Sequence, residues 1–198
     1  MLNIPELSFI NSFIPYENKD MELRLAFMSR ISPKKNLHNL LDSIRIVKNQ
    51  KVILDIYGPF DTNESRKYEI ICKQKIQMLK FNKNLRIDLK GYYNHEQFPE
   101  IISNYDYLIM PSFSENFGHV IIESILCGRK VILSKDLYIT KEFQALKDCF
   151  IFFEDFENIE TLVVKLIEEK DFAKIHNYSA VMNNFLDEFY KKPLFFYN

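Results

Sequence analysis

The sequence predicts an α/β protein built on a doubly wound, mostly parallel, six-stranded Rossmann-like sheet. Short apolar runs of five or six residues alternate with longer stretches in which apolar residues recur at helical spacing. This alternation occurs six times, and the first two runs stop at Ser29 and Gly58. Runs of this length and composition are typical of buried parallel strands rather than of helices.

The expected elements follow one another in a regular order along the chain. The strands are LRLAFM, VILDIY, LRIDL, DYLIM, KVILS and CFIFF, at residues 23–28, 52–57, 85–89, 106–110, 130–134 and 149–153. The helices cover residues 36–47, 64–80, 96–104, 118–127, 140–147, 158–170 and 179–190. In the usual strand order of this fold, 3-2-1-4-5-6, the first and fourth strands are neighbours.

The chain divides into three expected parts. Residues 1–22 hold Pro5, Pro15 and the polar sequence ENKD, which is typical of an N-terminal segment or linker. Residues 23–170 form the α/β domain. Residues 171–198 form a helical tail that ends in KKPLFFYN.

Composition and charge exclude several classes of protein. Lys and Arg number 26 against 27 Asp and Glu, so no basic field attracts nucleic acid or anionic lipid. The three cysteines lack a CxxC pair, which favours reduced thiols in a cytosolic compartment. The sequence shows no signal peptide and no apolar run of about 20 residues. We therefore expect a cytoplasmic protein without a transmembrane segment. Peripheral attachment to the inner face of the membrane, through a partner domain, stays open.

The two least ordinary loops of the sequence follow the first and fourth strands. They are SRISPKKN and PSFSENFG, and the expected strand order places them side by side at the crevice where such sheets bind ligands. The second loop runs into a helix starting near Gly118, whose free backbone N–H groups favour anions. These amides belong to Asn116, Phe117, Gly118 and His119.

Arg30 and Lys35 supply two cations across this crevice, on a loop stiffened by Pro33. Together with the helix terminus they suit a diphosphate. The alternative is that both are ordinary surface charges. His119 is the one histidine expected near the crevice, as a solvated residue at the start of the helix or as a phosphate contact.

Two glutamates stand eight positions apart around this helix start. Glu123 is the only charge between Val120 and Cys127 and is expected to be buried, so it needs hydrogen-bond donors. Two ribose hydroxyls could supply them; the alternative is a structural pair with a Lys or Arg of a neighbouring element. Glu115 could reach a sugar hydroxyl beyond the diphosphate, or serve only as an acid favoured by the helix dipole.

Other nucleotide and hydrolase signatures are missing from the sequence. It contains no GxGxxG after the first strand, no GxxxxGK[ST] and no GxSxG. The four histidines have no metal-ligand spacing, so no metal site is expected.

Four separated motifs resemble the donor-binding half of the family 4 retaining glycosyltransferases, which have the GT-B fold. They are FMSRISPKKNL, DIYGPF, LKGYYN and MPSFSENFGHVIIESILCGRKVILS, in that order and within residues 23–134. The last contains the family's two-glutamate signature as Glu115 and Glu123. The resemblance makes residues 23–170 a nucleotide-sugar (donor) binding domain.

The resemblance also implies roles for individual residues. Arg30 and Lys35 would bind the donor pyrophosphate, and Glu115 would contact the donor sugar; these three are the expected catalytic residues. Glu123 would hold the ribose, and the amides of Asn116, Phe117, Gly118 and His119 would bind phosphate and sugar. Gly58 would line the donor cleft, and Gly91 and Tyr92 would meet the base through main chain. The implied reaction is a metal-independent, cofactor-free hexosyl transfer with retention, in which these groups stabilise the leaving nucleoside diphosphate.

The sequence departs from the family in three places. The family's first Rossmann-like domain, which binds acceptor, is not present in residues 1–22. Arg129 and Lys130 follow Gly128 where relatives often have proline, and KDLYITKEF lacks the familiar glycine-rich turn and acidic residue.

Two interpretations of function follow. The first is a donor domain that acts with a separate acceptor domain in the synthesis of a polysaccharide or another glycoconjugate. The second is a truncated, non-catalytic nucleotide-sugar-binding or interaction module. Its aromatic tail would then contact a partner or a second copy of the chain, or pack on its own core; the tail aromatics are Phe189, Tyr190, Phe195, Phe196 and Tyr197.

Overall fold

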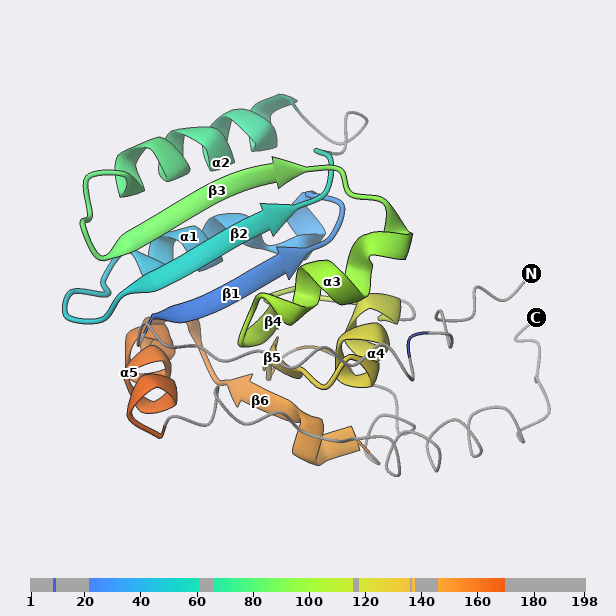
Figure 1. The fold of residues 1–198 in the computed structure, drawn as a ribbon. Coiled ribbons are helices and arrows are strands. Elements are labelled where there is room, and N and C mark those ends of the chain that lie inside the picture. Colours follow the sequence, from blue (N-terminus) through green and yellow to red (C-terminus); the bar gives the residue numbers. More distant parts are fainter. Residues whose placement is uncertain are drawn as a thin grey trace.

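A single six-stranded sheet organises the molecule (Figure 1). The computed structural model describes Phe9 and residues 22–60, 66–115, 118–135, 137 and 146–169. The strand order is β3-β2-β1-β4-β5-β6, and every neighbouring pair is parallel. The strands are β1 (Leu23–Met28), β2 (Val52–Tyr57), β3 (Leu85–Gly91), β4 (Tyr107–Met110), β5 (Lys130–Ser134) and β6 (Phe150–Phe153). The predicted fold class and strand order are therefore confirmed.

Five α-helices lie between or after these strands within the described residues, together with short 3-10 turns. The helices are α1 (Leu37–Ile44), α2 (Arg66–Leu79), α3 (Phe98–Ser103), α4 (His119–Leu126) and α5 (Ile159–Glu169). The turns are η2 (Pro33–Lys35), η3 (His95–Gln97) and η5 (Phe156–Asn158). The helix predicted at residues 179–190, the tail at residues 171–198 and most of the segment 140–147 lie outside the described residues.

The bounds of β1, β2 and β5 are the predicted ones, and those of β3, β4 and β6 differ by one or two residues. Asp106 precedes β4 rather than opening it; its Oδ2 accepts a hydrogen bond from the Arg24 amide at 2.7 Å, and its own amide donates to the Arg24 carbonyl at 2.9 Å. β3 continues to Gly91, which pairs with Tyr57 beyond a register shift. The amide of Gly58 then donates to the Gly91 carbonyl at 2.7 Å, so the ends of β2 and β3 stay joined.

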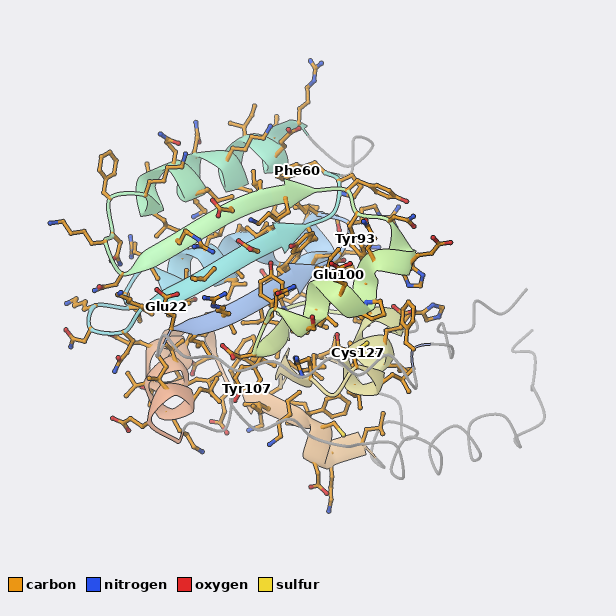
Figure 2. All side chains as sticks on the ribbon, in the orientation of Figure 1. Glu22, Phe60, Tyr93, Glu100, Tyr107 and Cys127 are labelled. Carbon is orange, nitrogen blue, oxygen red and sulfur yellow. The ribbon has the colours of Figure 1, made fainter. Side chains whose placement is uncertain are left out.

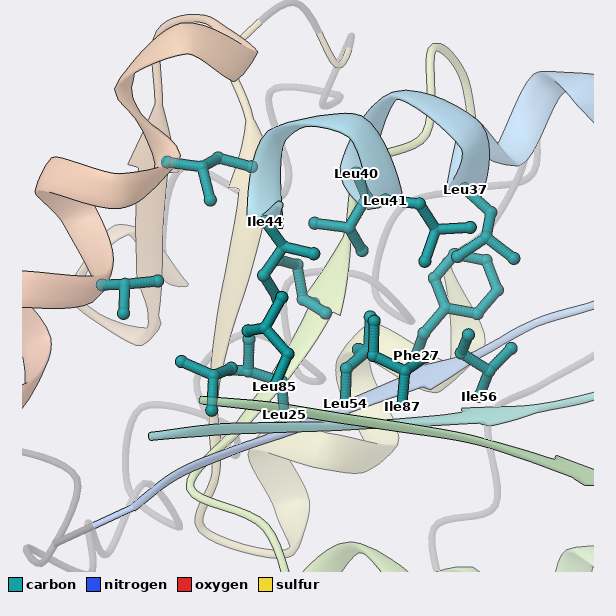
Figure 3. Close-up of a cluster of buried hydrophobic side chains, with 14 of the residues drawn as sticks. Leu25, Phe27, Leu37, Leu40, Leu41, Ile44, Leu54, Ile56, Leu85 and Ile87 are labelled. Carbon is teal, nitrogen blue, oxygen red and sulfur yellow. The ribbon is translucent and has the colours of Figure 1, made fainter. Parts of the chain in front are cut away.

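The core has two parts, one on each face of the sheet, because side chains alternate along a strand. Leu25 and Phe27 belong to the cluster that α1, α2 and α5 cover, whereas Ala26 and Met28 belong to the cluster with α3 and α4. Figure 3 shows the first cluster, with one side of α1 lying on β1, β2 and β3. Its labelled side chains are Leu25, Phe27, Leu37, Leu40, Leu41, Ile44, Leu54, Ile56, Leu85 and Ile87.

A buried polar network crosses the second face. The Tyr105 hydroxyl donates to Asp55 Oδ2 at 2.6 Å and lies 2.8 Å from the Tyr57 hydroxyl. Lys90 Nζ lies 3.3 Å from the same Asp55 oxygen. Burial, followed by its bond to Asp55, raises the pKa of Tyr105, so the phenol remains a donor. The network thus stabilises a carboxylate that is only 5% exposed in the middle of β2.

Replacing Tyr105 with phenylalanine should lower the free energy of unfolding by about 1–2 kcal/mol, because Asp55 stays buried and loses its shortest donor. Urea denaturation followed by circular dichroism measures the difference. Tyr57→Phe is the matched control, since it removes a hydroxyl but leaves the bond from Tyr105 to Asp55 intact. Equal losses in both variants would contradict this account of the network.

Two further sequence expectations concern the cysteines and the absence of a membrane-spanning helix. Cys72, Cys127 and Cys149 are all buried free thiols, as the lack of a CxxC pair predicted. Among the described helices, none is long and apolar enough to span a bilayer.

Candidate functional site

The loops after β1 and β4 lie against each other at the carboxyl edge of the sheet, as the strand order predicted. The Phe113 amide donates to the Lys34 carbonyl at 3.0 Å, which joins the two loops through main chain. Lys35 Nζ lies 2.6 Å from Glu115 Oε2 and joins them through side chains. Two loops about 80 residues apart in sequence are thus in direct contact at this edge of the sheet.

The pair of Lys35 and Glu115 is shielded from solvent. The two side chains are 20% and 12% exposed, so little water screens their attraction. Glu115 Oε1 is also buried and has no hydrogen-bond partner among the described residues. The Lys35–Glu115 pair is therefore a partly buried ion pair in which one carboxylate oxygen contacts the amine and the other is left without a hydrogen bond from the residues that the structure describes.

The loop after β1 is held in one shape by its own sequence. Pro33 opens the η2 turn, and Asn36 closes it in the left-handed conformation at φ 58°. Asn36 is fully buried and accepts a hydrogen bond from Asn39 through its side chain. The stiffening expected from Pro33 is thus reinforced by a buried asparagine.

Gly58 brings the ends of β1 and β2 into close contact. Its φ is +118°, and a Cβ there would lie 2.0 Å from the Ser29 carbonyl oxygen. On either side, the Ser29 amide donates to Tyr57 and the Ile31 amide donates to Pro59. Only glycine fits between these contacts, and the close approach positions Arg30.

A pocket of about 220 Å³ opens beside this contact. It is lined by Ser29, Arg30, Gly58, Pro59, Tyr92, Tyr93 and His95. Three of the predicted site residues, Arg30, Gly58 and Tyr92, therefore share one cavity. Tyr92 is 81% exposed at this cavity, and Figure 2 shows Tyr93 at the carboxyl edge of the sheet.

Helix α4 starts where the sequence predicted. Gly118 is its N-cap at φ 57°, and the amides of Ile121 and Ile122 donate to the Gly118 carbonyl. His119 is the first helical residue and is half-buried. Asn116 and Phe117, whose amides were predicted to bind phosphate, lie outside the described residues.

Glu123 is buried, as predicted, with 3% of its surface exposed. Its Oε2 lies 3.1 Å from Nε2 of His95, in the turn after β3. Burial and then the negative charge of Glu123 raise the pKa of Tyr93 to about 12, so this phenol stays neutral beside the carboxylate. His95 and Tyr93 thus lie next to the predicted ribose-binding acid.

The expectation that His119 was the one histidine near the crevice is wrong, because His95 lines the pocket. A signal was present: His95 follows LKGYYN directly, and the loop after the third strand also ends at the carboxyl edge. His95 is a partner that neither of the two sequence interpretations of Glu123 named.

Arg129, a departure from the family pattern, is buried and contacts the end of helix α3. It is 4% exposed, and its Nη2 donates to the carbonyl of Ser103, the last residue of α3, at 3.0 Å. A cation at the C-terminus of a helix is favoured by the helix dipole. Arg129 therefore fastens the segment after α4 to α3.

Metal-ligating side chains do not cluster in the described part of the chain. No group of three or more His, Cys, Asp or Glu residues there has the geometry to hold an ion.

A sequence-family model described as "Glycosyl transferases group 1" matches residues 10–180. The chain belongs to the glycosyl transferases group 1 family. No curated protein sequence matches it.

Several solved structures share the fold of this group 1 chain. Anabaena HepE, in complex with UDP and glucose, is 20% identical with a TM-score of 0.66, over 91% of this chain and 50% of its own. Sucrose-phosphate synthase from Thermosynechococcus elongatus is 18% identical with a TM-score of 0.70, over 89% and 46%. The C-terminal domain of LpcC, a group 1 protein from Francisella tularensis, is 16% identical with a TM-score of 0.66, over 93% and 98%.

These matches identify which part of a glycosyltransferase the chain resembles. It spans about half the length of HepE and of the sucrose-phosphate synthase, but nearly all of an isolated C-terminal domain. The predicted GT-B half is therefore confirmed as the fold of this group 1 chain.

Proposed function

We propose that the chain is the donor-binding half of a retaining, metal-independent glycosyltransferase that transfers a hexosyl group from a UDP-sugar to a glycan or glycoconjugate. The observation that carries the proposal is the contact between the loops after β1 and β4, which gathers Lys35, Glu115 and the start of α4 at one edge. The choice of UDP rests on the HepE structures, which contain UDP, UDP with glucose, or UDP-glucose.

The diphosphate would lie between Arg30, Lys35 and the N-terminus of α4. Arg30 faces the pocket and can grip two phosphate oxygens, while Lys35 acts as a point charge. On binding, Lys35 would turn from Glu115 toward phosphate, and Glu115 would accept from a sugar hydroxyl. The same cations would then stabilise the charge that develops on the leaving UDP.

The nucleoside would occupy the pocket itself. Glu123 would accept from the ribose hydroxyls, and the main chain at Gly91 and Tyr92 would meet the base. Gly91 ends β3 at φ +72° with open space around its Cα, so the backbone there is accessible to a ligand. Gly58 would form the floor of the donor cleft.

The acceptor would be bound by a second Rossmann-like half, because a GT-B active site lies between two such halves. That half would belong to the same protein or to a separate chain. The complete enzyme would act in the synthesis of a polysaccharide. This arrangement leaves residues 23–170 to supply the donor and the leaving-group chemistry.

Isothermal titration of the chain with UDP, GDP, ADP and their glucose conjugates tests the proposal. UDP should bind, and Arg30→Ala should weaken it at least tenfold, because a charge-assisted bond to phosphate is lost. Lys34→Ala is the matched control: it removes an exposed cation from the same loop and should change affinity less than twofold. If no nucleotide binds, the non-catalytic interaction module becomes the better interpretation.

A further inference from the structure

We propose that His95 is a positioning residue that holds the Glu123 carboxylate in the orientation required by the ribose of the donor. The inference rests on the proposed function and adds to it a group from the loop after β3. No role was expected for His95 in the sequence, and its place in the pocket comes from the structure alone.

The contact itself is suited to this task. His95 Nε2 lies 3.1 Å from Glu123 Oε2, and in the tautomer that carries its proton on Nε2 the ring donates to this carboxylate oxygen. Glu123 is almost fully buried, so a fixed donor offsets part of the cost of removing its charge from water. His95 keeps 51% of its side chain exposed, and the bond therefore connects the pocket wall to the buried acid.

The imidazole ring is held by its surroundings. Phe9 lies 5.3 Å from it between ring centroids, and Phe98 lies 6.3 Å away. Asn94 caps the η3 turn by accepting from the Glu96 amide, so the backbone at His95 is also fixed. A donor fixed before the ligand arrives reduces the entropy lost on binding.

His95 and a ribose can share the carboxylate. A carboxylate has about four lone-pair positions, so one bond from His95 leaves acceptor capacity for hydroxyl groups. The neutral phenol of Tyr93 adds no negative charge beside it. Under this proposal, His95 and the ribose would bind the same carboxylate together rather than compete for it.

The test compares two replacements of His95 by isothermal titration. His95→Phe keeps an aromatic ring beside Phe9 and Phe98 but removes the N–H, whereas His95→Gln keeps an N–H donor near the position of Nε2. The probes are UDP, 2′-deoxy-UDP and inorganic pyrophosphate. Gln97→Ala, an exposed change in the same turn, is the control, and thermal melting confirms that each variant is folded.

We expect His95→Phe to weaken UDP about tenfold and to leave pyrophosphate within about twofold, because only the ribose contact is disturbed. In His95→Phe the preference for UDP over 2′-deoxy-UDP should also shrink. His95→Gln should restore most of the UDP affinity and most of this preference. In a Glu123→Gln background, His95→Phe should have a much smaller effect, since the two residues act as one unit.

Unchanged or tighter UDP binding in folded His95→Phe would overturn the role of His95, the tighter result indicating that His95 blocks the ribose. An equal loss of UDP and pyrophosphate would also overturn it, because the damage would then be general. If the parent chain binds neither UDP nor pyrophosphate, the proposed function itself is wrong. This result differs from a failure of the role of His95, in which the parent chain binds UDP and His95→Phe binds it equally well.

Discussion

Replacing Gly58 with alanine should lower the free energy of unfolding by about 3 kcal/mol or more, the largest stability effect expected in this chain. The added Cβ would stand 2.0 Å from the Ser29 carbonyl oxygen and 2.7 Å from its carbonyl carbon, which are both backbone atoms. Backbone cannot rotate away as a long side chain can, so the ends of β1 and β2 must separate. Urea denaturation measures the loss.

The same substitution should also disturb nucleotide binding, because Arg30 follows directly after Ser29. UDP affinity should fall at least tenfold under conditions where the variant is still folded. Gly91→Ala is the matched control for the stability measurement only: Gly91 has φ +72°, but an added Cβ would meet nothing within 4 Å, so only backbone strain of about 1 kcal/mol applies. If Gly58→Ala lowers the free energy of unfolding no more than Gly91→Ala does, the close approach of Gly58 to the Ser29 backbone does not require glycine.

Replacing Glu123 with glutamine should weaken UDP about a hundredfold, the largest effect on binding expected from one side chain. The carboxylate would accept from the ribose hydroxyls, and each bond to a charged acceptor contributes about 1.5–3 kcal/mol. Glutamine fills the same volume and still offers one acceptor to His95, so the free energy of unfolding should change by less than about 1 kcal/mol. Titration calorimetry and thermal melting measure the two quantities separately.

Pyrophosphate separates this effect from general damage to the site. Its affinity should stay within about threefold in Glu123→Gln, because Arg30, Lys35 and the start of α4 remain. Glu96→Gln removes an exposed carboxylate close to His95 and should leave UDP affinity unchanged. Retention of full UDP affinity by Glu123→Gln would remove Glu123 from the site, whereas loss of both ligands would point to a disturbed helix.

Much of the frame was predictable because it depends on local patterns. Apolar runs separated by helical periodicity predicted all six strands within two residues. The alternation predicted parallel pairing, and the common order of such sheets placed the loops after the first and fourth strands together. Glu123 was predicted to be buried, because an otherwise apolar helix lies inside such a fold. The start of a helix near Gly118 followed from the same pattern, and the structure makes Gly118 its N-cap.

The contacts inside the site were beyond such patterns. Lys35 and Glu115 were each assigned to a ligand, but the structure pairs them with each other across 80 positions of sequence. Gly58 was expected to face a ligand, and its tightest constraint is instead the Ser29 backbone. Arg129 was interpreted as a departure from the family, yet it closes the C-terminus of α3.

The α/β class, the strand order, the edge at which the loops after β1 and β4 meet and the burial of Glu123 were thus all predictable, because periodicity and element order encode these features. The contact of Glu123 with His95, 28 positions earlier in the chain, is visible only in the folded structure. Hydrogen bonds depend on tenths of an ångström between side chains that the whole fold positions, and no spacing along a single chain specifies that distance.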